Sequence, residues 1–310
     1  MSTQWLLTLA HIAVTLVMPF LLVGVINRTK SWWAARKGPG LLQSFHDLRR
    51  LLRKRPVVSD TATPLFRLGA YVVLVCALAA MAFVPLLGQF APLSFAHDFV
   101  AVAYTLGLAR MVLMLSAMDV GSPFEGMGAA REAMFGTFAE PALFLLLGTV
   151  GVATGLSSFA DMLGYLHHTP YYGLIVLPLA LALLILLQTE GARVPVDDPA
   201  THLELTMIHE VMILDHSGPE LAAMQYAASL KMTLYAGLIA TLLNPVDPFA
   251  SPLAAIAVSV ALMLLVAVVV GCIESLMARL PLHWVPSYVW LSGWLVALAA
   301  LVVGVTGGGL

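Results

Sequence analysis

Eight apolar stretches, each long enough to cross a lipid bilayer, dominate this sequence of 310 residues. A helix needs about 20 mostly apolar residues to cross the hydrocarbon core. Only 10% of the residues are charged, against about 25% in soluble domains, which excludes a water-soluble enzyme. The sequence therefore predicts an all-α polytopic membrane protein, with residues 1–310 as one membrane domain. The predicted spans are 5–27, 65–89, 97–119, 139–162, 170–190, 221–243, 252–277 and 284–305.

Prolines help to place these helices, because a proline in the first turn of a helix removes no hydrogen bond. Pro85 and Pro178 fall inside or late in their stretches, and we expect them to kink the helices. Four others stand at or near the starts of theirs: Pro64, Pro141, Pro170 and Pro252.

The distribution of lysine and arginine predicts the orientation, because cytoplasmic connections are rich in these residues. The connection 28–64 holds nine of them, whereas the connections near 90–96, 163–169 and 244–251 hold none. We therefore place both termini on the outer side of a bacterial or archaeal cytoplasmic membrane. The predicted cytoplasmic connections are 28–64, 120–138, 191–220 and 278–283.

The first of these connections contains a predicted amphipathic helix that lies in the plane of the inner leaflet. Leu41, Phe45, Leu48 and Leu52 recur at helical spacing, while charged residues fill the other faces. The segment is interpreted either as a basic anchor that only fixes topology or as a docking surface for a cytoplasmic partner. The candidate docking residues are Arg36, Lys37 and, in the next connection, Arg131.

Charged side chains inside the apolar stretches are informative, because an ionised group at mid-membrane costs roughly 3 kcal/mol or more. Arg110 and Lys231 lie well inside the third and sixth stretches, and Glu140 and Glu190 lie at the cytoplasmic ends of the fourth and fifth. Such groups usually pair with one another and mark ion or proton routes. We predict a functional role for Arg110 and Lys231, with a purely structural ion pair as the alternative.

The third cytoplasmic connection is strongly acidic and contains a single arginine, Arg193. Asp198 and Pro199 are typical of a helix start, and Ser217 and Gly218 of a helix stop, which predicts a helix of about 18 residues. Its apolar residues lie on several faces, so we expect burial between the membrane part and another protein, and carboxylates with raised pKa values that exchange protons near neutral pH. The acids are Glu190, Asp197, Asp198, Glu204, Glu210 and Asp215.

No cofactor site is predicted in this chain. His209 and Glu210 lack the second histidine of a zinc-protease motif. The histidines at 202, 209 and 216 would stand about 10 Å apart on a helix, too far for one metal. The two cysteines lie in separate apolar stretches, without the clustered spacing of a metal site. Any redox centre is therefore expected in a partner, and the net charge of -2 gives no indication of nucleic-acid binding.

The acidic connection resembles the signature loop of the respiratory complex I subunit 1 family. It reads Glu-Gly-Ala-Arg-Val-Pro-Val-Asp-Asp-Pro over 190–199 and Asp-His-Ser-Gly over 215–218. Residues 195–199 and 205–210 (Leu-Thr-Met-Ile-His-Glu) resemble the branch of hydrogenase-4 component C and formate hydrogenlyase subunit 4, membrane subunits of group 4 NiFe hydrogenases. Supporting matches are Arg-Lys-Gly-Pro-Gly at 36–40, Gly-Ser-Pro-Phe-Glu-Gly-Met-Gly at 121–128 and Arg-Glu-Ala at 131–133.

This resemblance implies a subunit without cofactors that anchors a peripheral redox arm and links it to proton-pumping or sodium-pumping neighbours. The NiFe centre and the iron-sulfur clusters are expected in partner subunits, namely the hydrogenase large and small subunits and iron-sulfur subunits, beside antiporter-like membrane subunits. By the same resemblance, Glu190, Arg193, Asp197 and Glu204 line the junction with the arm, and Glu140 continues the acidic path into the membrane.

Two alternatives remain open at this stage. The first is a quinone-site subunit of a complex I relative; quinone-using members generally have Pro-Glu-Ala-Glu-x-Glu-Leu in this loop, whereas residues 199–205 read Pro-Ala-Thr-His-Leu-Glu-Leu. Two of the three acids are absent, which favours the hydrogenase branch. The second is a free-standing transporter; transporters often show related halves, and none is visible here.

Overall fold

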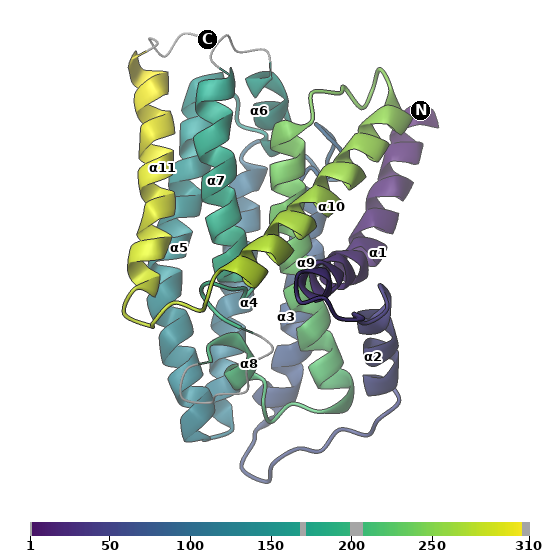
Figure 1. Cartoon of the computed structure of the whole chain (residues 1–310), viewed down its shortest axis with the longest axis vertical. Helices are drawn as coiled ribbons and strands as arrows, with labels where there is room; N and C mark the ends of the chain where they lie inside the picture. Colours follow the sequence, from purple (N-terminus) through teal and green to yellow (C-terminus); the bar gives the residue numbers. More distant parts are fainter. Residues whose placement is uncertain (1, 168–171, 199–206, 306–310) are drawn as a thin grey trace.

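Eight long helices form the body of the protein in a computed structural model that describes residues 2–167, 172–198 and 207–305 (Figure 1). All regular structure in these ranges is helical, and each long helix is apolar enough to cross a membrane. The predicted number of spans and the all-α fold are confirmed. The long helices are α1 (Ser2–Trp33), α3 (Pro64–Phe83), α4 (Asp98–Asp119), α5 (Pro123–Thr154), α7 (Tyr172–Glu190), α9 (Gly218–Leu243), α10 (Pro252–Leu276) and α11 (Val285–Val305).

Helix α9 lies at the centre of the bundle and packs against α1, α3, α7 and α10. On one side α5, α7 and α11 pack together, while α1 and α10 pack against each other and lean across the bundle (Figure 1). The start of α1 and the end of α11 lie at the same end of the molecule, as an even number of spans requires. The opposite end carries the short helices α2 (Gln43–Leu51) and α8 (His209–Met212), and we call it the α8 end.

The short helix α2 confirms the amphipathic segment, although Leu41 and Leu52 lie just outside it. None of its residues is fully buried, and it packs against α1 and α9. Phe45 of α2 meets Phe20 of α1 edge-to-face at 5.4 Å between ring centroids, and Phe20 stacks on Tyr226 of α9 at 5.2 Å. Aromatic contacts therefore fasten α2 to the side of the bundle. Its location in the plane of a membrane stays a prediction.

Helix α5 differs most from the sequence prediction. It begins at Pro123, so most of the predicted connection 120–138 is helix, and Pro141 and Glu140 lie within a helix of 32 residues. The hydropathy of the sequence did not reveal the first part of this helix. Glu125, Arg131 and Glu132 lower the mean hydropathy there, although the helix packs against other parts of the protein. The helix ends at Thr154, and α6 (Phe159–Leu166) fills the rest of the predicted span and part of the connection 163–169.

The predictions for Pro64 and Pro252 are confirmed, whereas those for Pro85 and Pro141 are wrong, because Pro141 lies inside α5 and not near the start of a helix. Pro64 and Pro252 lie in the first turns of α3 and α10, and Thr63 caps α3 by accepting a hydrogen bond from the backbone N–H of Leu65 at 3.2 Å. Pro85 does not kink a helix, because α3 ends at Phe83 and the chain is extended at Val84. Pro178 lies inside α7, and the kink expected there stays a prediction. Pro170 lies outside the described residues.

The connection between α7 and α9 does not form the helix of about 18 residues. In its described part, 191–198 and 207–217, only His209–Met212 is helical. Ser217 and Gly218 start α9 and do not stop a helix, because Pro219 follows in the first helical turn. His209 and His216 therefore do not share one helical stripe. Residues 199–206, which include Glu204 and His202, lie outside the described residues.

The folded connection is buried by this protein itself. Val211 and Met212 are fully buried, and α8 packs against α5 and α4. A Cβ atom at Gly128 of α5 would lie only 2.4 Å from Cγ1 of Val211, so the glycine lets the two backbones approach closely. The expected burial against the membrane part is confirmed, and burial against another protein stays a prediction.

Candidate functional site

Arg110 lies halfway along α4 and is surrounded by three carboxylates. Its Nε donates to Oε1 of Glu132 at 3.2 Å, and its two terminal nitrogens contact Glu140 and Glu190. The side chain is only 7% exposed. A guanidinium has five donors in a planar fork, which allows one arginine to bind several carboxylates at once.

The spacing of residues on α5 explains this arrangement. Glu132, Gly136 and Glu140 are four residues apart, so they lie in a row on one face of the helix. Gly136 has no side chain, and a Cβ atom there would lie 2.7 Å from Nη1 of Arg110. The arginine therefore lies over the bare backbone at Gly136, with one glutamate on each side of it.

Lys231 of α9 completes the arrangement by contacting the other oxygen of Glu190. Its Nζ donates to Oε2 of Glu190 at 3.2 Å, and both side chains are largely buried. Glu190, the last residue of α7, thus joins two cations from two other helices. We call these five residues the Arg110 cluster: Arg110, Glu132, Glu140, Glu190 and Lys231.

Two small cavities, each of about 10 Å³, lie against the Arg110 cluster. This is close to the smallest volume that holds one water molecule. Arg110 and Glu190 line both of them. The first also contacts Glu132, Asp197 and His209, and it is called the Glu132 cavity. The second also contacts Glu140 and Tyr235, and it is called the Glu140 cavity.

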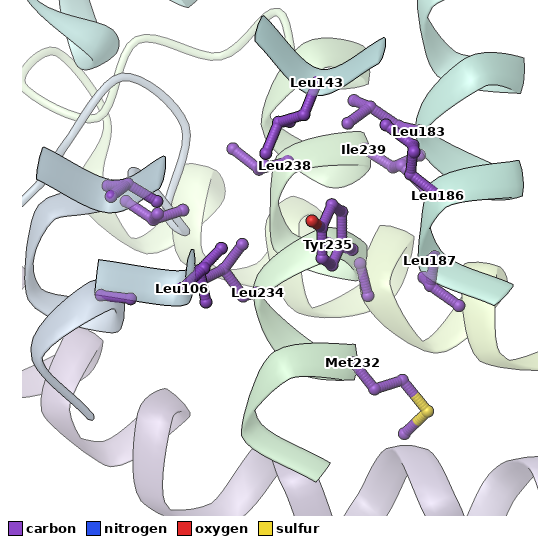
Figure 2. Packing of buried hydrophobic residues seen from close by; sticks show 14 of the residues in the cluster. Leu106, Leu143, Leu183, Leu186, Leu187, Met232, Leu234, Tyr235, Leu238 and Ile239 are labelled. Atoms are coloured by element: carbon purple, nitrogen blue, oxygen red, sulfur yellow. The ribbon is translucent and has the colours of Figure 1, made fainter. Parts of the chain in front are cut away.

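An apolar layer surrounds Tyr235 next to the Glu140 cavity. Figure 2 shows this tyrosine among leucine and isoleucine side chains of the buried core. Because few polar groups can compensate a charge in such surroundings, the electrostatic interactions inside the Arg110 cluster are strong. The labelled core residues are Leu106, Leu143, Leu183, Leu186, Leu187, Met232, Leu234, Leu238 and Ile239.

A second set of buried charges fixes the start of the connection after α7. Glu274 of α10 is paired with Lys30 of α1 at 2.8 Å and with Arg193 of the connection at 3.5 Å. Asp197 is paired with Arg279 at 3.0 Å and also accepts hydrogen bonds from two backbone N–H groups further along the connection. We call these two groups the loop clamp: Lys30, Arg193 and Glu274, and Asp197 with Arg279.

A larger cleft of about 360 Å³ opens between α1, α2, α9 and the connection after α7. Its wall combines apolar side chains such as Phe20 with charged ones, including Lys30, Arg193 and Glu210. The cleft therefore touches the loop clamp directly. It has room for part of a small amphiphilic molecule.

His216, just before α9, is buried at the α8 end. Its ring stacks on Phe66 of α3 at 3.9 Å between centroids, and its Nε2 lies 3.4 Å from Oγ of Ser116. Desolvation of the charged form lowers the pKa of His216 from 6.5 to about 4. His216 is therefore neutral at physiological pH.

Comparison with known proteins places this architecture in a family. The NADH dehydrogenase family, which contains subunit 1 of respiratory complex I, has a model that matches residues 6–305. The chain belongs to the NADH dehydrogenase family. As a member with eight membrane-spanning helices, it is a multi-pass membrane protein.

Two relatives align with nearly the whole length of this chain. Formate hydrogenlyase subunit 4 of Escherichia coli is 29% identical over 276 residues, which cover 87% of this chain and 89% of that protein. Hydrogenase-4 component C of Escherichia coli is 27% identical over 299 residues, 94% of this chain and 93% of that protein. An NADH-quinone oxidoreductase subunit of Wolbachia pipientis is 28% identical over 189 residues, which cover only 56% of this chain and 55% of that protein.

A solved structure shares the fold of this chain. A chain of the membrane-bound sulfane sulfur reductase, an archaeal respiratory membrane complex, superposes with a TM-score of 0.80 and covers 96% of this chain and 99% of its own length. Because its sequence identity is 18%, this likeness concerns the fold alone.

The structure brings four of the predicted site residues together in one cluster. Arg110, Glu140, Glu190 and Lys231 meet in the Arg110 cluster, and Arg193 and Asp197 belong to the loop clamp. Their roles in coupling stay predictions. Three other predicted residues lie apart from the cluster: Asp198 is half-buried, Glu210 lines the large cleft, and Asp215 is exposed. Glu204 lies outside the described residues.

The three predicted docking residues occupy different surroundings. Arg36 and Lys37 are exposed in the connection between α1 and α2. Arg131 lies on α5, where its Nη1 donates to the carbonyl oxygen of Met207 at 2.7 Å. Arg131 therefore helps to hold the connection after α7. Docking to a partner stays a prediction for all three.

Sequence reasoning missed Glu132, Gly136 and Lys30. Glu132 lies eight residues before Glu140, a spacing that places both on one helical face and could have revealed it. Lys30 was counted only as a topology signal, although its position in the last turn of α1 brings it to Glu274. Within the described residues, no group of three or more histidine, cysteine, aspartate or glutamate side chains could hold a metal ion.

Proposed function

We propose that this chain is the membrane anchor and coupling subunit of an energy-converting NiFe hydrogenase or formate hydrogenlyase complex. In this role it links electron transfer in a peripheral arm to translocation of protons or sodium ions. One observation carries the proposal. Glu190 is the last residue of α7, and the connection that the loop clamp holds in place begins at the next residue. The two relatives that match nearly the whole chain support the choice of the hydrogenase branch.

The geometry suggests how a redox event would reach the membrane part. A change of charge at a cluster of the arm would act first on the acids of the connection, at the predicted cytoplasmic α8 end. Asp197 and Glu190 line the same Glu132 cavity. A shift of the connection at Asp197 therefore changes the electrostatic environment of Glu190 directly. Glu190 then alters its pairing with Arg110 and Lys231 inside the bundle.

Partner subunits are supported by the position of Glu140. Its side chain is 47% exposed although it lies within a membrane-spanning helix. A half-exposed carboxylate that faces lipid is costly, whereas one that faces another protein can find a hydrogen-bond donor. We therefore propose that a neighbouring membrane subunit of the antiporter-like kind covers this part of α5. The hydrogenase and iron-sulfur subunits, which hold the NiFe centre and the clusters, would bind at the α8 end.

The first experiment is isolation of the native complex in mild detergent, followed by assays of nickel, iron and hydrogen evolution. We expect nickel and iron to copurify with this chain and the complex to evolve hydrogen. A complex that contains neither nickel nor hydrogen chemistry would contradict the proposal. Ion flux by the purified chain alone in liposomes would instead support a free-standing transporter.

Coupling is tested by Glu190→Gln, which keeps the size of the side chain and removes its charge. We expect the complex to assemble, because Arg110 keeps Glu132 and Glu140, and ion pumping in proteoliposomes to fall at least tenfold relative to hydrogen turnover. Asp247→Asn is the matched control, because Asp247 is an exposed acid outside the helices at the opposite end. Normal pumping in Glu190→Gln would show that the position is structural.

The large cleft favours a second candidate, a quinone-site subunit. Its volume of about 360 Å³ and its mixed wall of apolar and charged side chains suit the head of a quinone. This candidate predicts bound quinone in the purified complex and inhibition by quinone analogues. Full activity in the presence of such analogues would count against it.

A further inference from the structure

Most of the positive charge of the chain lies in residues 28–63, which lead from the last turns of α1 to the start of α3. They contain nine of the fifteen lysine and arginine residues but only two acids, Asp47 and Asp60. Lys30 is paired with Glu274, and Arg50 is paired with Asp47. The other seven cations are exposed and have no acidic partner among the described residues: Arg28, Arg36, Lys37, Arg49, Arg53, Lys54 and Arg55.

The cations elsewhere in the chain all bind to the protein itself. Arg131 donates to the carbonyl oxygen of Met207. The remaining five are each paired with at least one acid: Arg67, Arg110, Arg193, Lys231 and Arg279. The fold thus provides a partner for every cation outside residues 28–63. The seven unpaired cations are therefore available to an anion outside this chain.

Helix α2 places exposed apolar side chains beside several of these cations. Phe45 and Leu52 are 42% and 57% exposed, and their spacing of seven residues places them on one face of the helix and its last turn. Arg49 and Arg53 follow Phe45 at steps of four residues, so they lie in a row beside this face. We call these residues and the next two cations the α2 surface: Phe45, Arg49, Leu52, Arg53, Lys54 and Arg55.

The α2 surface lies beside a part of α1 that is exposed within a membrane span. Phe45 contacts Phe20 of α1, and Leu16 and Val17, about one turn before Phe20, are 49% and 50% exposed. The α2 surface therefore begins within about one helical turn of side chains that lie in hydrocarbon. This position favours phospholipid over a soluble acidic protein, because a phospholipid presents an anionic phosphate and hydrocarbon next to each other.

We propose that the α2 surface binds anionic phospholipids of the leaflet at the α8 end, which is the predicted cytoplasmic one. The guanidinium groups of Arg49, Arg53 and Arg55 bind phosphate oxygens, since the planar fork of arginine matches this geometry. Phe45 and Leu52 contact the adjoining part of the acyl chains. Clusters of four to eight cations on an amphipathic helix are typical of such binding. The inference goes beyond the proposed function and does not depend on which arm the complex has.

A lipid bound there also holds one wall of the large cleft. Ser44, Asp47 and Leu48 of α2 line that cleft, whereas the α2 surface lies on another side of the helix. No residue of α2 is fully buried, so the protein alone holds this helix by few contacts. The bound lipid therefore steadies α2 and, with it, the opening of the cleft.

The test measures which lipids the purified complex retains. The complex is equilibrated in detergent with equal amounts of phosphatidylglycerol and phosphatidylcholine, freed of micelles by gel filtration, and analysed for lipid by mass spectrometry. We expect a preference for phosphatidylglycerol of about fivefold or more, because one cation near an anionic surface already favours binding by about this factor. High salt should reduce the preference, because ions screen these charges. Equal retention of the two lipids would overturn the proposal.

Two matched triple variants assign the preference to the α2 surface. Arg49→Gln, Arg53→Gln and Arg55→Gln combined should remove most of it, whereas the same three positions changed to lysine keep the charge and should keep most of the preference. An unchanged preference in the glutamine variant would overturn the proposal. Loss of partner subunits from that variant, with the lipid preference intact, would show that a protein covers α2. The metal content of the same samples reports separately on the proposed function.

Photolabelling of the wild-type complex keeps the proposal testable if the glutamine variant does not insert correctly. The probes are phosphatidylglycerol and phosphatidylcholine that each carry a photoreactive group on the acyl chain near the glycerol. We expect the first probe to label peptides within residues 41–57 and the second to label them several-fold less. Labelling of this segment by both probes equally, or by neither, would contradict binding of anionic lipid to the α2 surface.

Discussion

The Arg110 cluster and the loop clamp are built from the same kinds of side chains, but with opposite charge balance. The cluster has three acids for two cations, whereas Glu274 in the clamp has two cations, Lys30 and Arg193, to itself. An acid held between two cations has its charge fully compensated. The clamp is therefore suited to fasten the chain, whereas in the cluster three carboxylates share two cations.

The two regions also join different parts of the fold. The cluster links α4, α5, α7 and α9, which all extend through the bundle. The clamp links α1 and α10 to the first residues of the connection after α7. A change at the clamp thus alters the position of the connection, whereas a change in the cluster alters charge inside the membrane part.

The largest expected effect is that of Arg110→Met, because it removes the cation that three carboxylates share. The loss of one partner from a buried ion pair destabilises a protein by about 3–5 kcal/mol. We expect a strongly reduced yield of assembled complex and a lower midpoint of thermal unfolding in detergent. A wild-type midpoint would mean that the carboxylates are compensated in another way.

Arg50→Gln is the control for this variant. Arg50 pairs with Asp47 on the exposed face of α2 at 2.7 Å, and its side chain is 70% exposed. Exposed ion pairs contribute about 0–1 kcal/mol, so the midpoint should hardly change. A large loss in this variant would indicate that α2 is covered by a partner in the complex.

Arg193→Ala should have a smaller effect than Arg110→Met, because Glu274 keeps Lys30 at 2.8 Å. The loss of a hydrogen bond to a charged group corresponds to about 1.5–3 kcal/mol. We expect a lower yield of complex and faster proteolysis of the connection 191–217. Unchanged yield and proteolysis would show that the clamp does not fasten the connection.

The acid response of His216 tests the far end of the same connection. Because the pKa of His216 is lowered to about 4 in the folded state, the unfolded state binds the proton more readily below pH 6.5. The free energy of unfolding should therefore fall as the pH drops from 6.5 toward 4, by about 1 kcal/mol at pH 6 relative to pH 7.5.

His216→Phe keeps an aromatic ring against Phe66 and removes the titration. Its midpoint of thermal unfolding should lose this part of the pH dependence between pH 7.5 and 6. If the variant and the wild type respond equally to acid, groups other than His216 cause the sensitivity.

Sequence patterns predicted the elements that lipid stabilises and failed where protein replaces lipid. The eight spans follow from the apolar stretches alone. A segment surrounded by hydrocarbon needs apolar side chains, and it must form its backbone hydrogen bonds within a helix. The first half of α5 was missed because Glu125 and Glu132 are buried against protein, which hydropathy cannot detect. The predicted helix in the connection failed because Asp197 accepts hydrogen bonds from Ile208 and His209 and folds the chain back on itself.

The sequence by itself determined that Arg110, Lys231, Glu140 and Glu190 lie in or beside membrane spans and need partners. Only the tertiary structure decided which groups pair, and it added Glu132 to the Arg110 cluster and Lys30 to the loop clamp. The physical reason is that the energy of an ionised side chain depends on the few charges within several ångströms of it. Those neighbours come from helices that are distant in the chain.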